Sequence, residues 1–270
     1  MRKSIITLLT DFGIKDHYVA SLKGVILGIN PHCTLIDISH QVSPQDIREG
    51  AFILANTYSF FPRGTIHLSV VDPEVGSSRK PILIVTKDYF FVGPDNGLFT
   101  LAAPREQVSQ VVALTNKKFF LPSVSATFHG RDLFAPVAGH LSLGVKPEAF
   151  GSELDSWMEL NFEKPRIKEK GLVGEILHID GFENLISNIR EQEFSDFTKD
   201  QPFVIKVGTK TIHGLKRRYS DGSMNELIAL FGSGGFLEIS VREGSAQKIL
   251  KAKRGDPIQI STKFRAPNPK

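Results

Sequence analysis

The sequence has little cysteine and no long apolar run, and its opening segment is not expected to be a signal peptide. Cys33 is the only cysteine among 270 residues, so the chain can form no internal disulfide, and nothing points to an oxidising compartment. No window approaches the ~18–20 apolar residues of a membrane-spanning helix. The opening MRKSIITLLTDFG has an apolar core too short for a signal peptide and no small-residue cleavage site. We therefore predict a soluble, cytoplasmic protein without a membrane partner.

The charge of the chain is not concentrated enough for a nucleic-acid partner. The net charge is +4, and the basic residues gather only in two short runs, KRR at 216–218 and KAKR at 251–254. Runs of this size are typical of solvated faces. Hydrophobic residues make up 41% and charged residues 23% of the chain, which is the balance of a globular protein with a sizeable core.

The common catalytic and cofactor motifs are also missing. The chain contains no G-x-G-x-x-G after its first strand, no G-x-x-x-x-G-K-[ST], no G-x-S-x-G and no H-E-x-x-H. Cys33 precedes a predicted strand and is expected in the core rather than as a nucleophile. A metal site from His129, Asp132 and Asp72 is conceivable, but Arg79 beside the carboxylate would disfavour a cation. We expect neither a metal nor a cofactor.

The first half of the chain alternates between apolar strands and amphipathic helices, which predicts an α/β fold with an open, largely parallel sheet. The second predicted helix has Ser43 as its N-cap and Pro44 in its first turn. The expected strands are 4–10, 34–39, 65–71, 81–86 and 89–92, and the expected helices are 18–29, 43–64 and 132–142.

The character of the sequence changes at the charged stretch NFEKPRIKEKG, residues 161–171. We predict an N-terminal α/β domain over 1–162, a linker over 163–171 and a smaller C-terminal β-barrel domain over 172–270. The barrel is predicted from short β-like segments separated by glycine turns. Two stretches are expected to add short helices. The expected strands include 171–180, 202–208, 210–215, 236–241 and 256–261, and the expected helices are 193–200 and 223–231.

Polar residues stand where several predicted strands end. Asp11 and Asp16 follow the first strand, Asp72 and Arg79 follow the third, and FHGRD at 128–132 leads into a helix. In an open α/β sheet the ligand crevice lies at the carboxyl ends of the strands, so these clusters are candidate site residues. The alternative is structural: Asp11 caps a helix or turn, Asp72 caps the strand end and Arg79 is solvated. His129 is then a packed or solvated histidine, and Arg131 and Asp132 form a local pair.

Two further candidates lie in the second domain. DGFENLISN carries Asp180, Asn184 and Asn188 after a strand, and SVREGSA places Arg242 at a strand end before a short helix. Taken alone, the first segment is an ordinary turn and the second contains a solvated arginine.

Seven segments in this order are far more specific together than any one of them alone. They are LTDFG, DISHQVSPQDIREGAFIL, VVDPEVGSSR, VGPDNGLF, ATFHGRDLFAPVAGHL, IDGFENLISNI and FGSGGFLEISVREGSA. They resemble the S-adenosylmethionine hydroxide adenosyltransferase family, which is related to fluorinase and chlorinase, and the resemblance spans about residues 4–262. It implies an N-terminal α/β domain, a C-terminal β-barrel and a homotrimer, with each site between the N-terminal domain of one subunit and the C-terminal domain of its neighbour.

The resemblance also gives the candidate residues their roles. Asp72, Arg79 and His129 match the family's hydroxide-activating triad, which implies hydrolysis of S-adenosylmethionine to adenosine and L-methionine without a metal. The substrate contacts implied by motif position are Asp11 to the ribose diol, Asp180 to the amino group, Asn184 to the adenine edge, Arg242 to the carboxylate, and Phe182 and Phe231 stacked on adenine unless they are core residues.

Three departures from the halogenase relatives disfavour halide as the nucleophile, and one of them is the absence of the fluorinase-type insertion between the third strand and FHGRD. Gly130 stands where fluorinase has a serine that contacts the halide, and Asp72-Pro73 stands where the halogenases have a tyrosine before proline. A carboxylate at that place would repel fluoride or chloride. A chlorinase-like transferase and a binding protein without turnover stay open as alternatives.

Overall fold

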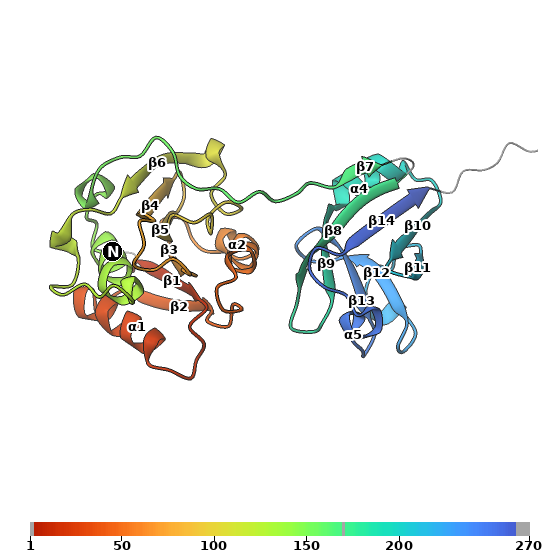
Figure 1. The fold of residues 1–270 in the computed structure, drawn as a ribbon, viewed down its shortest axis with the longest axis horizontal. Coiled ribbons are helices and arrows are strands. Elements are labelled where there is room, and N and C mark those ends of the chain that lie inside the picture. The colour runs from red at the N-terminus through yellow and green to blue at the C-terminus, as the bar shows by residue number, and fades with distance from the viewer. Residues whose placement is uncertain (1–2, 169–170, 263–270) are drawn as a thin grey trace, which may run out of the picture. The chain divides into compact units, whose positions relative to one another are not determined.

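The computed structural model describes residues 3–168 and 171–262 (Figure 1). The chain divides into two compact units, Met1–Asn161 and Phe162–Lys270, each with its own hydrophobic core. Within the predicted linker, Arg166–Lys168 forms the short strand β7, which pairs with the first long strand of the second unit. Residues 169–170 of the linker lie outside the described part of the chain.

The N-terminal unit is built on a six-stranded sheet, which confirms the predicted largely parallel α/β class. The strand order is β2-β1-β3-β5-β4-β6, with β2, β1, β3 and β5 parallel to one another, while β4 runs antiparallel to both β5 and β6. The strands are β1 (Ile5–Thr10), β2 (Thr34–Ser39), β3 (Ile66–Val70), β4 (Pro81–Thr86), β5 (Phe90–Pro94) and β6 (Val108–Ala113).

Helices cover both faces of this sheet, and this is why β1 and β3 are buried at almost every position. The core on one face joins Ile6 and Leu8 of β1 to helices α1 (Tyr18–Ile29) and α3 (Ala135–Ser142). The core on the other face joins Leu9 of β1 to α2 (Ile47–Ala55). Alternate residues of one strand therefore face different cores.

The start of α2 differs from the prediction. The N-cap is Asp46, whose side chain accepts a hydrogen bond from Glu49 N at 2.9 Å, so the prediction of Ser43 as the cap is wrong. Gln45 adopts a left-handed φ of 67°, which interrupts any helix that would begin at Pro44. The amide of Ser43 instead donates to the Glu49 carboxylate at 3.0 Å. Tyr58 lies beyond α2, in the short 3₁₀ turn Tyr58–Phe60.

The predicted helix at 132–142 is α-helical only in its second part. Gly130–Phe134 forms a π-helical turn, and α3 begins at Ala135. Pro136 sits in the first turn of α3, where its missing N–H removes no intrahelical hydrogen bond. Such wide turns occur often at functional sites, and this one begins directly after His129.

The C-terminal unit is an antiparallel sheet of eight strands with the order β11-β10-β14-β8-β9-β13-β12, and β7 pairs with β8. Its two end strands, β11 and β12, also contact each other, so the sheet is nearly closed and barrel-like, as predicted. The strands after β7 are β8 (Gly171–Ile179), β9 (Leu185–Arg190), β10 (Phe203–Val207), β11 (Lys210–His213), β12 (Leu227–Phe231), β13 (Phe236–Val241) and β14 (Pro257–Thr262).

Two short helices complete this unit, α4 (Glu191–Thr198) and α5 (Ala246–Leu250). Helix α4 confirms the prediction at 193–200, but the helix predicted at 223–231 is wrong, because Leu227–Phe231 is strand β12 paired with β13. Its short apolar run fits a buried strand as well as a helix, and sheet pairing decides between them. Within the described residues, no helix is long and apolar enough to cross a membrane.

Candidate active site

The structure brings Asp72, Arg79 and His129 into direct contact. Arg79 donates to both carboxylate oxygens of Asp72, from Nε to Oδ1 at 2.9 Å and from Nη2 to Oδ2. Arg79 Nη2 also lies 2.9 Å from Nδ1 of His129. The side chains of Arg79 and Asp72 are 3% and 5% exposed, so the solvated reading of Arg79 is wrong. A buried, two-pronged ion pair of this kind holds both partners in one orientation.

A glycine contact positions the loops that carry these residues. Asp72 and Arg79 belong to the connection between β3 and β4, and His129 ends a loop that follows β6. Gly76 lies midway along the first loop with φ 82°, and a Cβ atom there would come within 2.3 Å of the Ala126 carbonyl oxygen. Only glycine permits both the backbone conformation and this approach, which holds the Arg79 loop against the His129 loop.

Burial and the Arg79 cation keep His129 neutral. Burial lowers the pKa of His129 most, the charge of Arg79 lowers it further, and the nearby carboxylates of Asp72 and Asp132 oppose both effects. Because a guanidinium can only donate, Nδ1 of His129 must be the acceptor in their contact. The neutral ring then carries its proton on Nε2, so His129 can donate a hydrogen bond from that atom.

One donor of the triad is left open. Arg79 Nη1 is buried and has no hydrogen-bond partner among the residues that the structure describes. The guanidinium also lies over the ring of Phe134, with its carbon 5.3 Å from the ring centroid. A buried, unpaired N–H of a cation is costly unless a ligand fills it, and an oxygen with negative charge is the matching ligand.

Asp11 lies close enough to Asp72 for their charges to interact. Burial raises the pKa of Asp11, and the Asp72 charge raises it further, while the amide of Gln45 donates to Asp11 Oδ2 at 2.8 Å and acts in the opposite direction. The structure thus places Asp11 within electrostatic reach of Asp72. Asp16, the other acid of this segment, is exposed.

A hydrogen-bonded chain that the sequence did not reveal holds the Asp11 loop. His40 is buried, its Nδ1 lies 2.8 Å from Thr10 Oγ1, and its Nε2 lies 3.1 Å from Asp37 Oδ1. The carbonyl of His40 accepts from Gly13 N at 2.7 Å, so both sides of Asp11 are fixed to the same histidine. No signal in the sequence separated His40 from an ordinary histidine.

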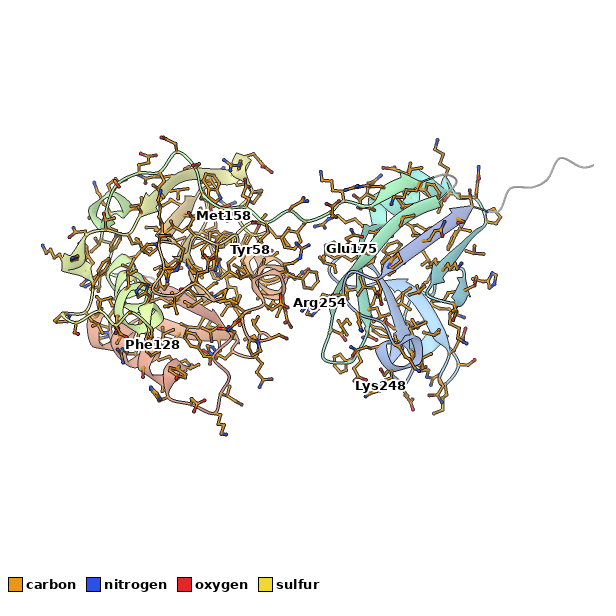
Figure 2. The ribbon with its side chains drawn as sticks, viewed as in Figure 1. Tyr58, Phe128, Met158, Glu175, Lys248 and Arg254 are labelled. Atoms are coloured by element: carbon orange, nitrogen blue, oxygen red, sulfur yellow. The ribbon has the colours of Figure 1, made fainter. Side chains whose placement is uncertain are left out.

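An aromatic cluster that the sequence also missed lies beside His129. Gly130 is buried, and a Cβ atom there would meet the rings of Phe12 and Phe128 at 3.3 and 3.4 Å. Tyr18 packs edge-on against Phe128 (labelled in Figure 2), with ring centroids 5.1 Å apart. The strand-end cluster therefore has an apolar wall as well as its charged groups.

The alternative of a local pair holds for Arg131 and Asp132. The carboxylate of Asp132 is fully buried and accepts from Arg131 Nε at 2.6 Å and from Ser125 N at 2.8 Å. Arg131 also covers the ring of Phe128. These contacts give both residues a structural role beneath the site. The described residues contain no group of three or more His, Cys, Asp or Glu that could hold a metal ion.

In the C-terminal unit, Asp180 and Asn184 lie together at the end of β8. Asp180 Oδ1 accepts from the amides of Phe182 and Asn184 at 2.9 Å each, and Oδ2 accepts from Asn184 Nδ2 at 3.0 Å. The oxygen of the Asn184 side chain is thereby turned away from the acid and can accept a donor. Asn188 is elsewhere engaged, since it bonds Glu175 N and Glu163 O.

The two candidate stacking residues, Phe182 and Phe231, differ in how far their side chains are exposed. Phe182 is 81% exposed, so the core reading is wrong for this side chain and an aromatic face is open to a ligand. Phe231 is half-buried against the barrel core, with its ring 5.4 Å from that of Phe194. The core reading fits Phe231, and adenine stacking stays a prediction for both.

Arg242 follows β13 and lies against the segment that contains Tyr219. Its Nη1 donates to the carbonyls of Gly222 at 3.1 Å and Ser220 at 3.5 Å. Burial raises the pKa of Tyr219 to about 12, helped by its hydrogen bond to Glu238 and by the charges of Glu238 and Asp180. Tyr219 and Glu238 belong to this neighbourhood although the sequence did not mark them.

The fold and these side chains define a two-domain protein whose α/β domain carries an enzyme-type arrangement of a buried acid, guanidinium and imidazole at its strand ends. The chain belongs to the S-adenosylmethionine (SAM) hydroxide adenosyltransferase family. Residues 6–151 match the family's N-terminal domain, and residues 174–259 match its C-terminal domain.

The names of similar proteins agree with this assignment. An (R)-S-adenosyl-L-methionine hydrolase of Methanocaldococcus jannaschii is 37% identical over 95% of both chains, and one of Thermus thermophilus is 36% identical over 93% of this chain and 97% of its own. A fluorinase of Nocardia brasiliensis is 24% identical over 96% of this chain and 97% of its own. A solved structure from Thermotoga maritima matches with a TM-score of 0.89 and 39% identity, covering 95% of this chain and 99% of that one.

Proposed function

We propose that this protein is an enzyme that hydrolyses S-adenosylmethionine to adenosine and L-methionine. The observation that carries the proposal is the buried contact of Arg79 with both Asp72 and His129, which leaves one guanidinium donor open. The family assignment and the names of the hydrolase relatives support the choice of substrate and reaction.

The reaction needs an activated nucleophile rather than a general acid. The leaving group is a neutral thioether, so it departs with the electron pair of the C5′–S bond and needs no proton. Attack by water in line with that bond forms the C5′–O bond, and the water must lose a proton. Holding the two partners in attack geometry can supply up to about 7–11 kcal/mol of the barrier.

The triad supplies what the water needs. Arg79 Nη1 binds the attacking oxygen and its cation favours the hydroxide form, while the Nε2–H of His129 orients that oxygen. Asp72 is the acceptor within the triad, and its lone pairs exceed the two hydrogen bonds that Arg79 donates. The proton that leaves the water therefore goes to a free lone pair of the Asp72 carboxylate.

The substrate contacts follow the same two groups of residues. Asp11 binds the ribose diol, and Gly130, packed against Phe12 and Phe128 next to His129, contacts the substrate through its backbone. In the C-terminal unit, Asn184 binds the adenine edge, Phe182 and Phe231 stack on the base, Asp180 meets the amino group and Arg242 the carboxylate. No metal or cofactor enters this scheme, and the cytoplasmic location stays a prediction.

Isotope labelling tests the reaction directly. The purified protein is incubated with S-adenosylmethionine in H₂¹⁸O, and the products are separated by chromatography. Their masses are then measured by mass spectrometry. We expect adenosine that carries one ¹⁸O at its 5′ position, together with unlabelled methionine. Asp72→Asn should abolish the product, whereas the matched surface change Asp88→Asn should not. Unlabelled adenosine, or none, would refute hydrolysis at C5′.

A halide-using transferase is the second candidate, and the structure gives a reason to place it second. The Asp72 carboxylate is buried beside the position proposed for the nucleophile, and it would repel a halide there. With chloride in the same incubation, a transferase forms 5′-chloro-5′-deoxyadenosine in place of adenosine. A binding protein without turnover forms neither product over hours, and His129→Ala then changes nothing.

A further inference from the structure

One face of strand β13 is polar although it is buried. Leu237, Ile239 and Val241 alternate along the strand and enter the barrel core. Glu238 and Ser240 point to the opposite face, as the strand period requires, yet they are only 5% and 0% exposed. A buried glutamate on a strand face that is not the core needs a partner.

The partners of Glu238 satisfy only one of its oxygens. Oε1 accepts from the Tyr219 hydroxyl at 2.8 Å and from Ser240 Oγ at 2.7 Å. Among the described residues no donor reaches Oε2, and no lysine, arginine or histidine forms an ion pair with Glu238. Glu238 is therefore almost fully buried, and no basic side chain of the described residues pairs with its carboxylate.

The open oxygen lies at a glycine turn. A Cβ atom on Gly232 would come within 2.5 Å of Glu238 Oε2, so the absence of a side chain at this turn makes room for the oxygen. The turn from Gly232 to Gly235 joins β12 to β13 and follows Phe231 directly. A small ligand group could meet Oε2 where the turn carries no side chain.

A second acid stands in the same neighbourhood. Asp180 is close enough to Tyr219 for its charge to act on the phenol that donates to Glu238. The oxygens of Asp180 accept three hydrogen bonds from Phe182 and Asn184, but no basic side chain of the described residues pairs with it. Two acids without a cation call for a cationic ligand.

We propose that Glu238 is a substrate-binding residue that accepts the α-ammonium group of the methionine portion of S-adenosylmethionine. This inference rests on the proposed function. An ammonium group supplies the charge that Glu238 and Asp180 lack, whereas the adenine amino group is neutral and would leave that charge unmatched. The free oxygen of the Asn184 amide already suits the adenine amino group.

Glu238→Gln is the variant that tests the assignment, because its amide oxygen can still accept from Tyr219 and Ser240 while the Oε2 position becomes a donor. We expect KM for S-adenosylmethionine to rise roughly 10- to 100-fold, the loss of a hydrogen bond to a charged group, with kcat nearly unchanged. Glu191→Gln, an exposed acid of α4 in the same unit, should leave both constants as in the wild type.

Two substrate analogues distinguish whether Glu238 binds the α-amino group or the adenine amino group. With the analogue that lacks the α-amino group, wild type and Glu238→Gln should have equal KM values. With the analogue that carries oxygen in place of the adenine amino group, the variant should show the same rise in KM as with the normal substrate. An unchanged KM for S-adenosylmethionine, or a rise lost only with the adenine analogue, overturns the proposal.

Failure of the proposed hydrolysis can be distinguished from failure of the proposed ammonium site. If the wild type forms no adenosine, calorimetric titration with S-adenosylmethionine still measures the affinity of both proteins. Weaker binding by Glu238→Gln then supports the ammonium site without the hydrolysis, and equal binding removes the site. Circular dichroism melts of both variants show whether the barrel remains folded.

Discussion

At the scale of single residues, Arg79 connects every part of the candidate active site. Its fork holds Asp72, its Nη2 fixes the tautomer of His129, and its Nη1 is free for an incoming oxygen. These three roles need a planar group with donors in several directions, which a lysine cannot provide. Position 79 therefore requires the geometry of a guanidinium as well as its positive charge.

Arg79→Lys tests this distinction. The variant keeps the positive charge but loses the fork, so the oxygen-binding donor and the contact with His129 cannot both be made. We expect kcat for adenosine formation to fall about 10²–10³-fold, as when one transition-state donor is removed. Steady-state assays by chromatography measure this, with Arg63→Lys, at an exposed surface pair, as the control. A fall below fivefold contradicts the role of the fork.

The pH dependence of the reaction follows from His129. Its pKa is lowered from the ordinary 6.5 by burial and by Arg79, so the ring stays neutral at pH 7 and somewhat below pH 6.5. We expect kcat to be flat from about pH 8 down to 6.5 and to fall only at lower pH, where the ring gains a proton and must release Arg79. A profile that falls already between pH 8 and 6.5 contradicts this assignment.

At the scale of elements, the approach of two loops creates the triad. Gly76 in the β3–β4 loop packs against Ala126 in the loop before His129. Gly76→Ala adds left-handed backbone strain of about 1–2 kcal/mol and a clash with the Ala126 carbonyl. We expect the loops to separate and kcat to fall at least tenfold, with a modest loss of thermal stability.

A matched variant separates strain from contact. Gly64 has a similar φ of 86°, but a Cβ atom there meets nothing within 4 Å. Gly64→Ala should therefore lose comparable stability in thermal melts and keep its kcat. Equal kcat values for the two variants would show that loop approach does not build the site.

Strand β3 also carries a histidine that makes the N-terminal unit sensitive to acid. His67 is fully buried among Tyr58, Phe61, Tyr89 and Phe91, with Nδ1 bonded to Thr7 Oγ1 at 2.7 Å. Burial lowers the pKa of His67 to about 3. The unfolded chain binds the proton near pH 6.5, so between pH 6.5 and about 3 the unfolded state holds more protons and stability falls as the pH falls.

The expected slope is about 1.4 kcal/mol of unfolding free energy for each pH unit below 6.5. Other groups titrate in the same range, so the variant His67→Phe is needed, which keeps an aromatic ring and removes the titration. Urea unfolding at pH 7, 6, 5 and 4 should show the wild type losing stability faster than the variant by about that slope. Parallel pH curves would contradict the burial of a neutral histidine.

At the scale of the whole molecule, the candidate residues fall into two sets on two folded units. Asp11, Asp72, Arg79 and His129 belong to the first unit, and Asp180, Asn184 and Arg242 belong to the second. The family resemblance implies a homotrimer in which each site joins the two sets from neighbouring subunits. This assembly stays a prediction, and sedimentation measures the number of subunits.

Complementation tests the shared site. Asp72→Ala disables only the first set and Arg242→Ala only the second, so each variant alone should be nearly inactive. If neighbouring subunits share a site, mixed trimers contain some sites with both sets intact, and activity should reappear when the two are unfolded and refolded together. Mixtures that stay inactive, from variants that each form trimers, would mean that one subunit supplies both sets.

Much of the fold could be predicted because its signals are local. The apolar runs of β1 and β3 and the helical spacing of α1 are set by neighbouring residues, and the structure has them nearly where the sequence places them. The errors occur where local signals conflict. Ser43 and Asp46 are both good caps, and the left-handed Gln45 selects the second; Leu227–Phe231 fits either a helix or a strand, and pairing with β13 selects the strand.

The sequence by itself determined the two-part α/β and β-barrel organisation, the family, and the candidates at the strand ends, because periodicity and motif order depend on residues close together in the chain. Only the tertiary structure decided that Arg79 would bond both Asp72 and His129 Nδ1 and leave its Nη1 unpaired, that His40 would hold the Asp11 loop, and that Glu238 would be buried with an open oxygen. Such contacts depend on how distant loops approach after the sheet has formed, and no local pattern encodes that approach.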